Sequence, residues 1–105
     1  MVKVRVRYFG RIRELLGIRE EEYDVDDAVL ADLLLKHVPN RHSEVAREWI
    51  ETIFKTVMGE VALGGDRQPI LRDNYMVYVN GRTCEVNYKL RDGDEVAILP
   101  PVGGG

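Results

Sequence analysis

Residues 2–9 alternate between apolar and mostly basic side chains, which is the pattern of a β-strand with one buried face. Residues 19–25 alternate in the same way, but their polar positions are acidic. The polar rows are Lys3, Arg5 and Arg7 on the first strand and Glu20, Glu22 and Asp24 on the second. If the strands pair antiparallel, these rows form cross-strand ion pairs that fix the register, because a slip of one residue would bury charges. The basic row therefore indicates a paired sheet face rather than a nucleic-acid site.

Helical spacing follows in three segments. Residues 11–16 predict a short helical turn that ends at Gly17. A longer helix is expected to begin with Asp26 or Asp27 as its cap and to end at Pro39-Asn40. Its apolar positions are Val29, Leu30, Leu33 and Leu34. Residues 43–58 predict a second amphipathic helix, whose apolar face is Val45, Trp49, Ile50, Ile53, Phe54 and Val57.

The last third of the chain returns to strand patterns. After a loop at residues 61–69, residues 76–79 predict a strand closed by the hairpin turn Asn80-Gly81. Residues 82–86 predict a short strand, and residues 95–99 a final strand that can lie parallel beside the first. This order predicts an α+β, β-grasp (ubiquitin-like) fold, a mixed sheet with helices packed on one face, an extra helix insertion and a flexible C-terminal Gly-Gly tail. We expect one domain, residues 1–105, with the tail at 100–105.

The alternation also assigns side chains to the outer face of the sheet near the tail. Phe9 shares the outward face with Arg7, whereas Val96 and Ile98 point inward and Leu99 points outward. We expect Phe9 and Leu99 to be exposed and to bind a partner, because apolar anchors dominate such interfaces.

Composition narrows the class of protein. The 105 residues are 45% hydrophobic and 31% charged, as in soluble domains, and the net charge of −3 gives no electrostatic reason to bind nucleic acid. The single cysteine, Cys84, excludes an internal disulfide. The sequence has no apolar run of membrane-spanning length, and its first residues resemble a strand rather than a signal peptide, so we expect a cytoplasmic location.

The body of the chain lacks a recognisable catalytic motif. Its glycines fit neither nucleotide-binding fingerprint, and no metal site is expected. We interpret His37 and His42 as surface residues, and Cys84 and Trp49 as packing residues. Chemistry is therefore expected at the C-terminus or nowhere.

The chain ends in Pro100-Pro101-Val102-Gly103-Gly104-Gly105. Ordering the three glycines would cost on the order of 3–6 kcal/mol of backbone entropy, so we expect the tail to be ordered only by a partner. The terminal carboxylate is a poor acyl donor. Attack on the α-phosphate of ATP would give an acyl-adenylate, and sulfur displacing AMP would give a thiocarboxylate. Such chemistry needs a separate activating enzyme. A frayed terminus without function is the alternative.

Two segments, residues 8–17 and 90–105, closely resemble the ends of the MoaD-type small subunits of molybdopterin synthase, a family of ubiquitin-like sulfur carriers. The signature comprises the turn at residues 13–15, the turn at residues 92–96 and the Pro-Pro-Val-x-Gly-Gly ending. The resemblance covers roughly residues 1–37 and 74–105, whereas residues 41–72 form a longer segment than compact members have. Gly103 fills a variable position, so the essential pair maps to Gly104 and Gly105.

The resemblance implies a sulfur carrier in molybdenum or tungsten cofactor biosynthesis that is not catalytic alone and binds no cofactor. A ubiquitin-activating-type adenylyltransferase would use ATP to adenylate Gly105, and a sulfurtransferase would supply the sulfur of the thiocarboxylate. Inserted into the large synthase subunit, the tail would donate sulfur to cyclic pyranopterin monophosphate. The residues expected to contact partners are Phe9, Leu99, Pro100, Pro101, Val102 and Gly103.

Three other interpretations remain open. Small archaeal modifier proteins share the predicted fold and tail but are joined to lysines by an isopeptide bond. Thiazole-synthesis sulfur carriers also share them but usually lack a pair like Pro100-Pro101. A ubiquitin-like interaction module with an incidental tail is the third.

Overall fold

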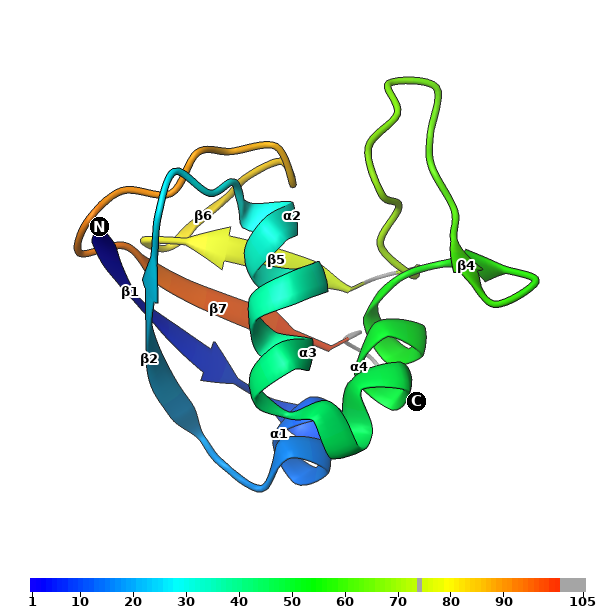
Figure 1. Cartoon of the computed structure of the whole chain (residues 1–105), viewed down its shortest axis with the longest axis horizontal. Coiled ribbons are helices and arrows are strands. Elements are labelled where there is room, and N and C mark those ends of the chain that lie inside the picture. The colour runs from blue at the N-terminus through cyan, green and yellow to red at the C-terminus, as the bar shows by residue number, and fades with distance from the viewer. Residues whose placement is uncertain (74, 101–105) are drawn as a thin grey trace.

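The computed structural model describes residues 1–73 and 75–100, within which five strands form one mixed sheet. The strands are β1 (Val2–Tyr8), β2 (Glu20–Val25), β5 (Met76–Val79), β6 (Arg82–Thr83) and β7 (Glu95–Leu99). They lie in the order β2-β1-β7-β5-β6, with β1 antiparallel to β2 and parallel to β7 (Figure 1). The predicted β-grasp fold is confirmed.

The register of β1 and β2 is the one that the charge pattern predicts. The basic and acidic rows stand directly opposite each other, as Lys3–Asp24, Arg5–Glu22 and Arg7–Glu20. The ion pairs of Arg5 and Arg7 with this acidic row span 3.5 to 4.0 Å. Their side chains are about half exposed, so each pair contributes only tenths of a kcal/mol. Their value lies in fixing the register.

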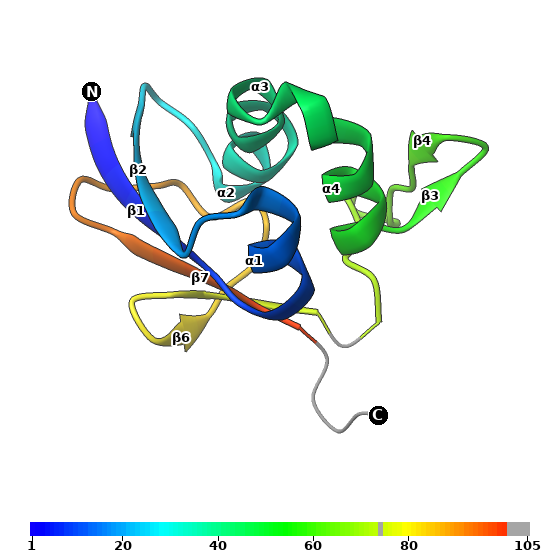
Figure 2. The ribbon, with the colours of Figure 1, turned by 90° about the horizontal axis from the view of Figure 1, so that it is seen from below.

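Helices cover one side of the sheet (Figure 2). Helix α1 (Gly10–Leu16) joins β1 to β2 and ends at Gly17, whose φ of 72° gives the predicted left-handed cap. One longer helix then runs through α2 (Leu30–Asp32), the π turn η1 (Leu33–His37) and α3 (Val38–Arg41). The 3-10 turn η2 (Ser43–Val45) leads into α4 (Ala46–Ile53).

The predicted cap of the long helix at Asp26 or Asp27 is wrong. The helix begins at Leu30, and its first free N–H groups donate to carbonyls of the loop before β7, Leu30 to Tyr88 and Ala31 to Val86. Asp27 instead pairs with Lys89 at 2.6 Å. The first helical N–H groups therefore bond to tertiary carbonyls, and the local side-chain bond at this start comes from Asp32, whose Oδ2 accepts from the Val29 N–H at 3.0 Å.

The predicted end of this helix at Pro39 is also wrong. Within η1 the Val38 N–H bonds the carbonyl of Leu33, five residues back, so the turn is wider than an α-turn. The Leu34 carbonyl then has no donor in the helix, because in a π turn its partner would be the N–H that Pro39 lacks. The indole Nε1–H of Trp49 supplies that bond at 2.7 Å. The helix thus continues through Pro39 to Arg41.

The second helix is shorter than predicted. It ends at Ile53, and Phe54 is already extended, with φ −109° and ψ 150°. The chain then forms a small hairpin from β3 (Thr56–Val57) and β4 (Glu60–Val61). Backbone bonds from Lys55 to Ile70 and from Arg72 to Ile53 hold this segment extended. Pairing with residues further along the chain therefore overrides the helical periodicity, and Val57 is 63% exposed instead of buried.

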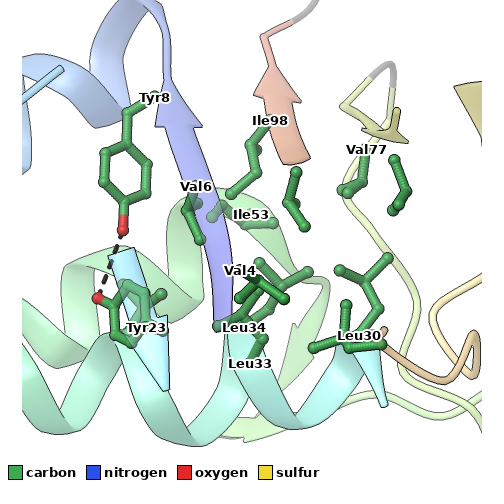
Figure 3. Close-up of a cluster of buried hydrophobic side chains, with 14 of the residues drawn as sticks. Val4, Val6, Tyr8, Tyr23, Leu30, Leu33, Leu34, Ile53, Val77 and Ile98 are labelled. Atoms are coloured by element: carbon green, nitrogen blue, oxygen red, sulfur yellow. Dashed lines mark hydrogen bonds between the residues drawn. The ribbon is translucent and has the colours of Figure 1, made fainter. Parts of the chain in front are cut away.

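The core lies between the sheet and the helices, as Figure 3 shows. Full burial of one such side chain contributes about 1.5–3 kcal/mol. The fully buried members include Val4, Val6, Tyr8 and Ile98 from the sheet, Leu30, Leu33 and Leu34 from the long helix, and Trp49 and Ile53 from α4. Helix α4, within the longer segment at residues 41–72, is therefore part of the core, which agrees with the packing role predicted for Trp49.

A carboxylate lies at the edge of this core. Glu21 stands opposite Val6 in the register, and its side chain is only 9% exposed. Its Oε2 accepts hydrogen bonds from the hydroxyls of Tyr8 and Tyr23, both at 2.6 Å, and from Nε2 of His42 at 2.7 Å. His42 is 18% exposed, so the prediction that it is a surface residue is wrong. The cause is the inward position of Glu21, which needs donors when buried.

The network sets the titration of its members. Burial alone would raise the pKa of Glu21, but the hydrogen bonds from Tyr23, Tyr8 and His42 outweigh it and hold the pKa below its ordinary value. Burial and the hydrogen bond to Glu21 raise the pKa of Tyr8 and of Tyr23. The stable state at neutral pH is therefore one carboxylate held by neutral phenols.

This network makes acid stability depend on Glu21. Because the pKa of Glu21 is lower in the folded protein than its ordinary value of 4.5, the carboxylate stabilises the fold fully above that pH. The contribution is lost as the pH falls below it. Glu21→Gln should lower the free energy of unfolding at pH 7 by about 1.5–3 kcal/mol, with a smaller difference near pH 3. Urea denaturation at both pH values measures this. The control Glu22→Gln, on the exposed face, should change stability by less than about 1 kcal/mol. Equal losses at the two pH values would contradict the assignment.

Candidate functional site

The C-terminus leaves the sheet from its centre. Strand β7 pairs in parallel with β1, so that Ile98 stands opposite Tyr8. The strand ends at Leu99, one residue after this pair, as Phe9 is on the β1 side. Figure 2 shows this end of β7 near the start of α1. Pro100 is the last described residue, and Pro101, Val102, Gly103, Gly104 and Gly105 lie outside the described residues. In the sequence the predicted tail therefore follows a strand that is paired with β1 on one edge and with β5 on the other.

An apolar surface surrounds this exit on the helix-free side of the sheet. Residues that stand opposite each other share a face, and the register pairs Leu99 with Met76 and Ala97 with Tyr78. Phe9 continues the same face of β1 beyond Arg7. We call Phe9, Met76, Tyr78, Ala97 and Leu99 the outer apolar patch. Met76 is 41% exposed and the other four are half-buried.

Charged side chains border the patch. The Arg7 guanidinium lies 5.4 Å from the centre of the Phe9 ring, and its Nη1 donates to Glu95 at 3.4 Å. Within the patch itself, the Tyr78 hydroxyl donates to the sulfur of Met76 at 3.9 Å. An apolar centre with a polar border is the composition of a protein interface.

Phe9 and Leu99 lie on the predicted outer face, together at the tail exit, but they are less exposed than predicted. Arg7 lies over the ring of Phe9, and Met76 stands opposite Leu99, so each is partly covered by a neighbour. Sequence reasoning missed Met76, Tyr78 and Ala97 as members of this surface. Their signal is the alternation in β5 and β7, which becomes informative only once β5 is known to pair with β7.

A cleft of about 550 Å³ lies beside the exit, between α1 and α4. Its lining includes Arg11, Glu48, Thr52, Arg72, Tyr75 and Pro100. Glu48 and Thr52 belong to α4, so the long inserted segment forms one wall of the region from which the tail departs.

The other candidate groups lie away from the exit. Cys84 is partly buried after β6, and burial together with the nearby Asp94 and Glu85 raises the pKa of its thiol. A thiol with a raised pKa is a poor nucleophile, which agrees with a packing role. Trp49 is fully buried, as predicted, and His37 is half-buried on the long helix.

The described ranges 1–73 and 75–100 were compared with the features of a metal site and of a membrane-spanning helix. No three His, Cys, Asp or Glu side chains there gather as a metal site would need. None of the helices found within those ranges is long and apolar enough to cross a bilayer.

The strand order, the helices on one face and the central C-terminal strand define a β-grasp protein of the ubiquitin-like class. Within that class the chain belongs to the ThiS family, whose model matches residues 6–105. It is 30% identical over 105 residues to a molybdopterin synthase sulfur carrier subunit of Homo sapiens, covering 100% of this chain and 97% of the relative. The resemblance to the MoaD-type subunits is confirmed.

Two solved structures show the same architecture. A putative molybdopterin converting factor, subunit 1, from Pyrococcus furiosus is 32% identical with a TM-score of 0.67, covering 97% of this chain and 100% of that one. The small archaeal modifier protein 1 of Methanosarcina acetivorans is 25% identical with a TM-score of 0.71, covering 100% and 98%. One fold is therefore shared by a protein named as a molybdopterin converting factor subunit and by one named as a small modifier.

Proposed function

We propose that this protein is the sulfur carrier subunit of a molybdopterin synthase and that Gly105 carries the sulfur. The observation that supports this most is that only Pro100 and Pro101 separate the ending Val102-Gly103-Gly104-Gly105 from the central strand β7, whose last residue belongs to the outer apolar patch. A partner bound to the patch would receive this ending, and the 30% identical human relative is named for that task.

The chemistry requires the terminal carboxylate and two partners. The Gly105 carboxylate attacks the α-phosphate of ATP on a ubiquitin-activating-type adenylyltransferase, giving an acyl-adenylate and pyrophosphate. Hydrosulfide, or an equivalent from a sulfurtransferase, then adds to the acyl carbon and displaces AMP, which leaves a thiocarboxylate. The protein supplies no catalytic side chain to these steps. It presents the acyl carbon to enzymes that do.

Sulfur delivery requires a third partner, the large subunit of the synthase. The outer apolar patch would dock on that subunit while the tail enters its active site. There the thiocarboxylate sulfur would attack a carbon of cyclic pyranopterin monophosphate and displace its oxygen substituent, giving a thioester between carrier and substrate. Water would then hydrolyse the acyl–sulfur bond, which leaves the sulfur on the substrate and restores the Gly105 carboxylate. Glycines at 104 and 105 suit this path because they lack the Cβ that a narrow channel would exclude.

The next prediction concerns the C-terminal tail and distinguishes a loss of thiocarboxylate formation from a loss of folding. Deletion of Gly105 or the substitution Gly104→Val should leave the unfolding temperature unchanged, because the core ends before these residues. Both should abolish conversion to the thiocarboxylate, since the acyl carbon falls short or a side chain blocks the channel. Mass spectrometry of the intact protein, after incubation with activating enzyme, ATP and a sulfur donor, detects replacement of one carboxylate oxygen by sulfur.

Gly65→Val is the matched control, because it adds the same side chain to a glycine of the loop after β4, where a Cβ would meet nothing within 4 Å. It should be converted like the wild type. A wild-type protein that stays unmodified while it still binds the large subunit would overturn the carrier proposal and favour the interaction module.

The docking prediction concerns the patch. Phe9→Ala and Leu99→Ala should each weaken binding to the large subunit by about 1–3 kcal/mol while the fold stays intact, because each removes an apolar anchor. Titration calorimetry measures the affinity. Met58→Ala serves as the control, since Met58 is 98% exposed on the β3–β4 hairpin, outside the patch. An unchanged affinity for both patch variants, or an equal loss for the control, would place the interface elsewhere.

A second candidate function is conjugation to lysines as a small protein modifier. The 0.71 TM-score and full-length match to the Methanosarcina acetivorans modifier favour keeping it. Both functions begin with the same adenylate, so the activated protein should be offered a cell extract of its source. Isopeptide-linked Gly105 on lysines in tryptic peptides would support conjugation, whereas sulfur transfer without such peptides would support the carrier alone.

A further inference from the structure

Gly10 and Pro100 touch just beyond the ends of the neighbouring strands β1 and β7. Gly10 is the first residue of α1 and has a φ of +62°, which few residues other than glycine adopt. A Cβ built on Gly10 would lie 2.9 Å from Cγ of Pro100 and 3.4 Å from its Cβ. Real Cβ atoms essentially never approach another heavy atom within 3.0 Å. The Pro100 ring therefore packs on the bare face of Gly10.

Gly17, at the other end of the same helix, shows that this contact is not a general property of glycines with positive φ. Its φ is +72°, close to that of Gly10, but a Cβ there would meet nothing within 4 Å. The left-handed cap of α1 is enough to explain Gly17. At Gly10 two separate features favour glycine: the positive φ and the close contact with the Pro100 ring.

The contact sits at a place where it can set the direction of the tail. Gly10 follows Phe9 of the outer apolar patch, and Pro100 follows Leu99 of the same patch. Pairing of Tyr8 with Ile98 already fixes β1 and β7 side by side. Beyond that pair β1 and β7 no longer pair with each other, although Leu99 still pairs with Met76 of β5. The ring of Pro100 on Gly10 is a further contact between the two segments. Because proline also has a fixed φ, seating its ring fixes the chain direction at its exit.

We propose that Gly10 is a positioning residue for sulfur transfer: its missing side chain seats Pro100 and so fixes where residues 101–105 leave relative to the patch. The inference rests on the proposed function. A partner bound to the outer apolar patch would then find the tail starting from a fixed position relative to that patch. A side chain on Gly10 would push Pro100 away, and a displacement of about 1 Å at a reacting group can cost roughly 100-fold in rate.

The test compares four variants, Gly10→Ala, Gly17→Ala, Pro100→Ala and the double variant Gly10→Ala/Pro100→Ala. Both glycine variants place alanine at a left-handed φ and should lower the unfolding temperature by a similar amount, about 4–8 °C. Of the two glycine variants, only Gly10→Ala should also slow conversion to the thiocarboxylate, by about 10- to 100-fold in kcat, with the affinity for the activating enzyme unchanged. Pro100→Ala removes the Cγ that would clash, so the double variant should recover the rate of Pro100→Ala alone.

A direct readout keeps the test independent of activity and of the folding of any variant. In the wild-type protein, a nuclear Overhauser effect between the Gly10 α-protons and the Pro100 γ-protons should be observed, and its absence would overturn the inference. Equal conversion rates for Gly10→Ala and Gly17→Ala would also overturn it while leaving the carrier function standing. A wild-type protein that is never converted would overturn the carrier function, and this inference with it.

Discussion

The parallel pairing of β1 with β7 is the constraint on which the rest of the structure depends. It joins segments almost a full chain length apart, so its loop-closure entropy must be offset by the core that forms around it. Pairing at the sheet centre buries Val4, Val6 and Ile98 on the helix side. It also brings the end of β7 beside the beginning of α1. The position of the candidate site is thus a consequence of the fold's most central contact.

The sequence predicts the features that depend on local alternation. The register of β1 and β2 follows from opposed charges, and the outward positions of Phe9 and Leu99 follow from counting along each strand. The long helix could not be delimited in this way. Its start is capped by carbonyls of the loop before β7, and its passage through Pro39 depends on an N–H from Trp49. Both are tertiary contacts that no local pattern encodes.

The same distinction applies to the candidate site. The alternation of side chains along β7 places Leu99 on the outer face, but only the pairing of β5 with β7 brings Met76 beside it. The alternation along β2 also places Glu21 on the inner face, where a buried carboxylate needs hydrogen-bond donors. Two of those donors, Tyr8 and Tyr23, are neighbours in the sheet, whereas His42 arrives from the end of the long helix. Sequence reasoning therefore assigns faces well and partners poorly.

The division of labour between body and tail follows from these contacts. A glycine ending can enter a narrow channel only because it has no side chains, and for the same reason it cannot position itself. Position must come from the body, through a strand held at the sheet centre and a docking surface on the same strand end. In this protein α4 adds Trp49 and Ile53 to the same core, where Trp49 packs edge-on against Tyr8 of β1, the strand beside β7. The inserted segment thus belongs to the body that, under the proposed function, has to place the tail, whereas the group proposed to react belongs to the last glycine of the sequence.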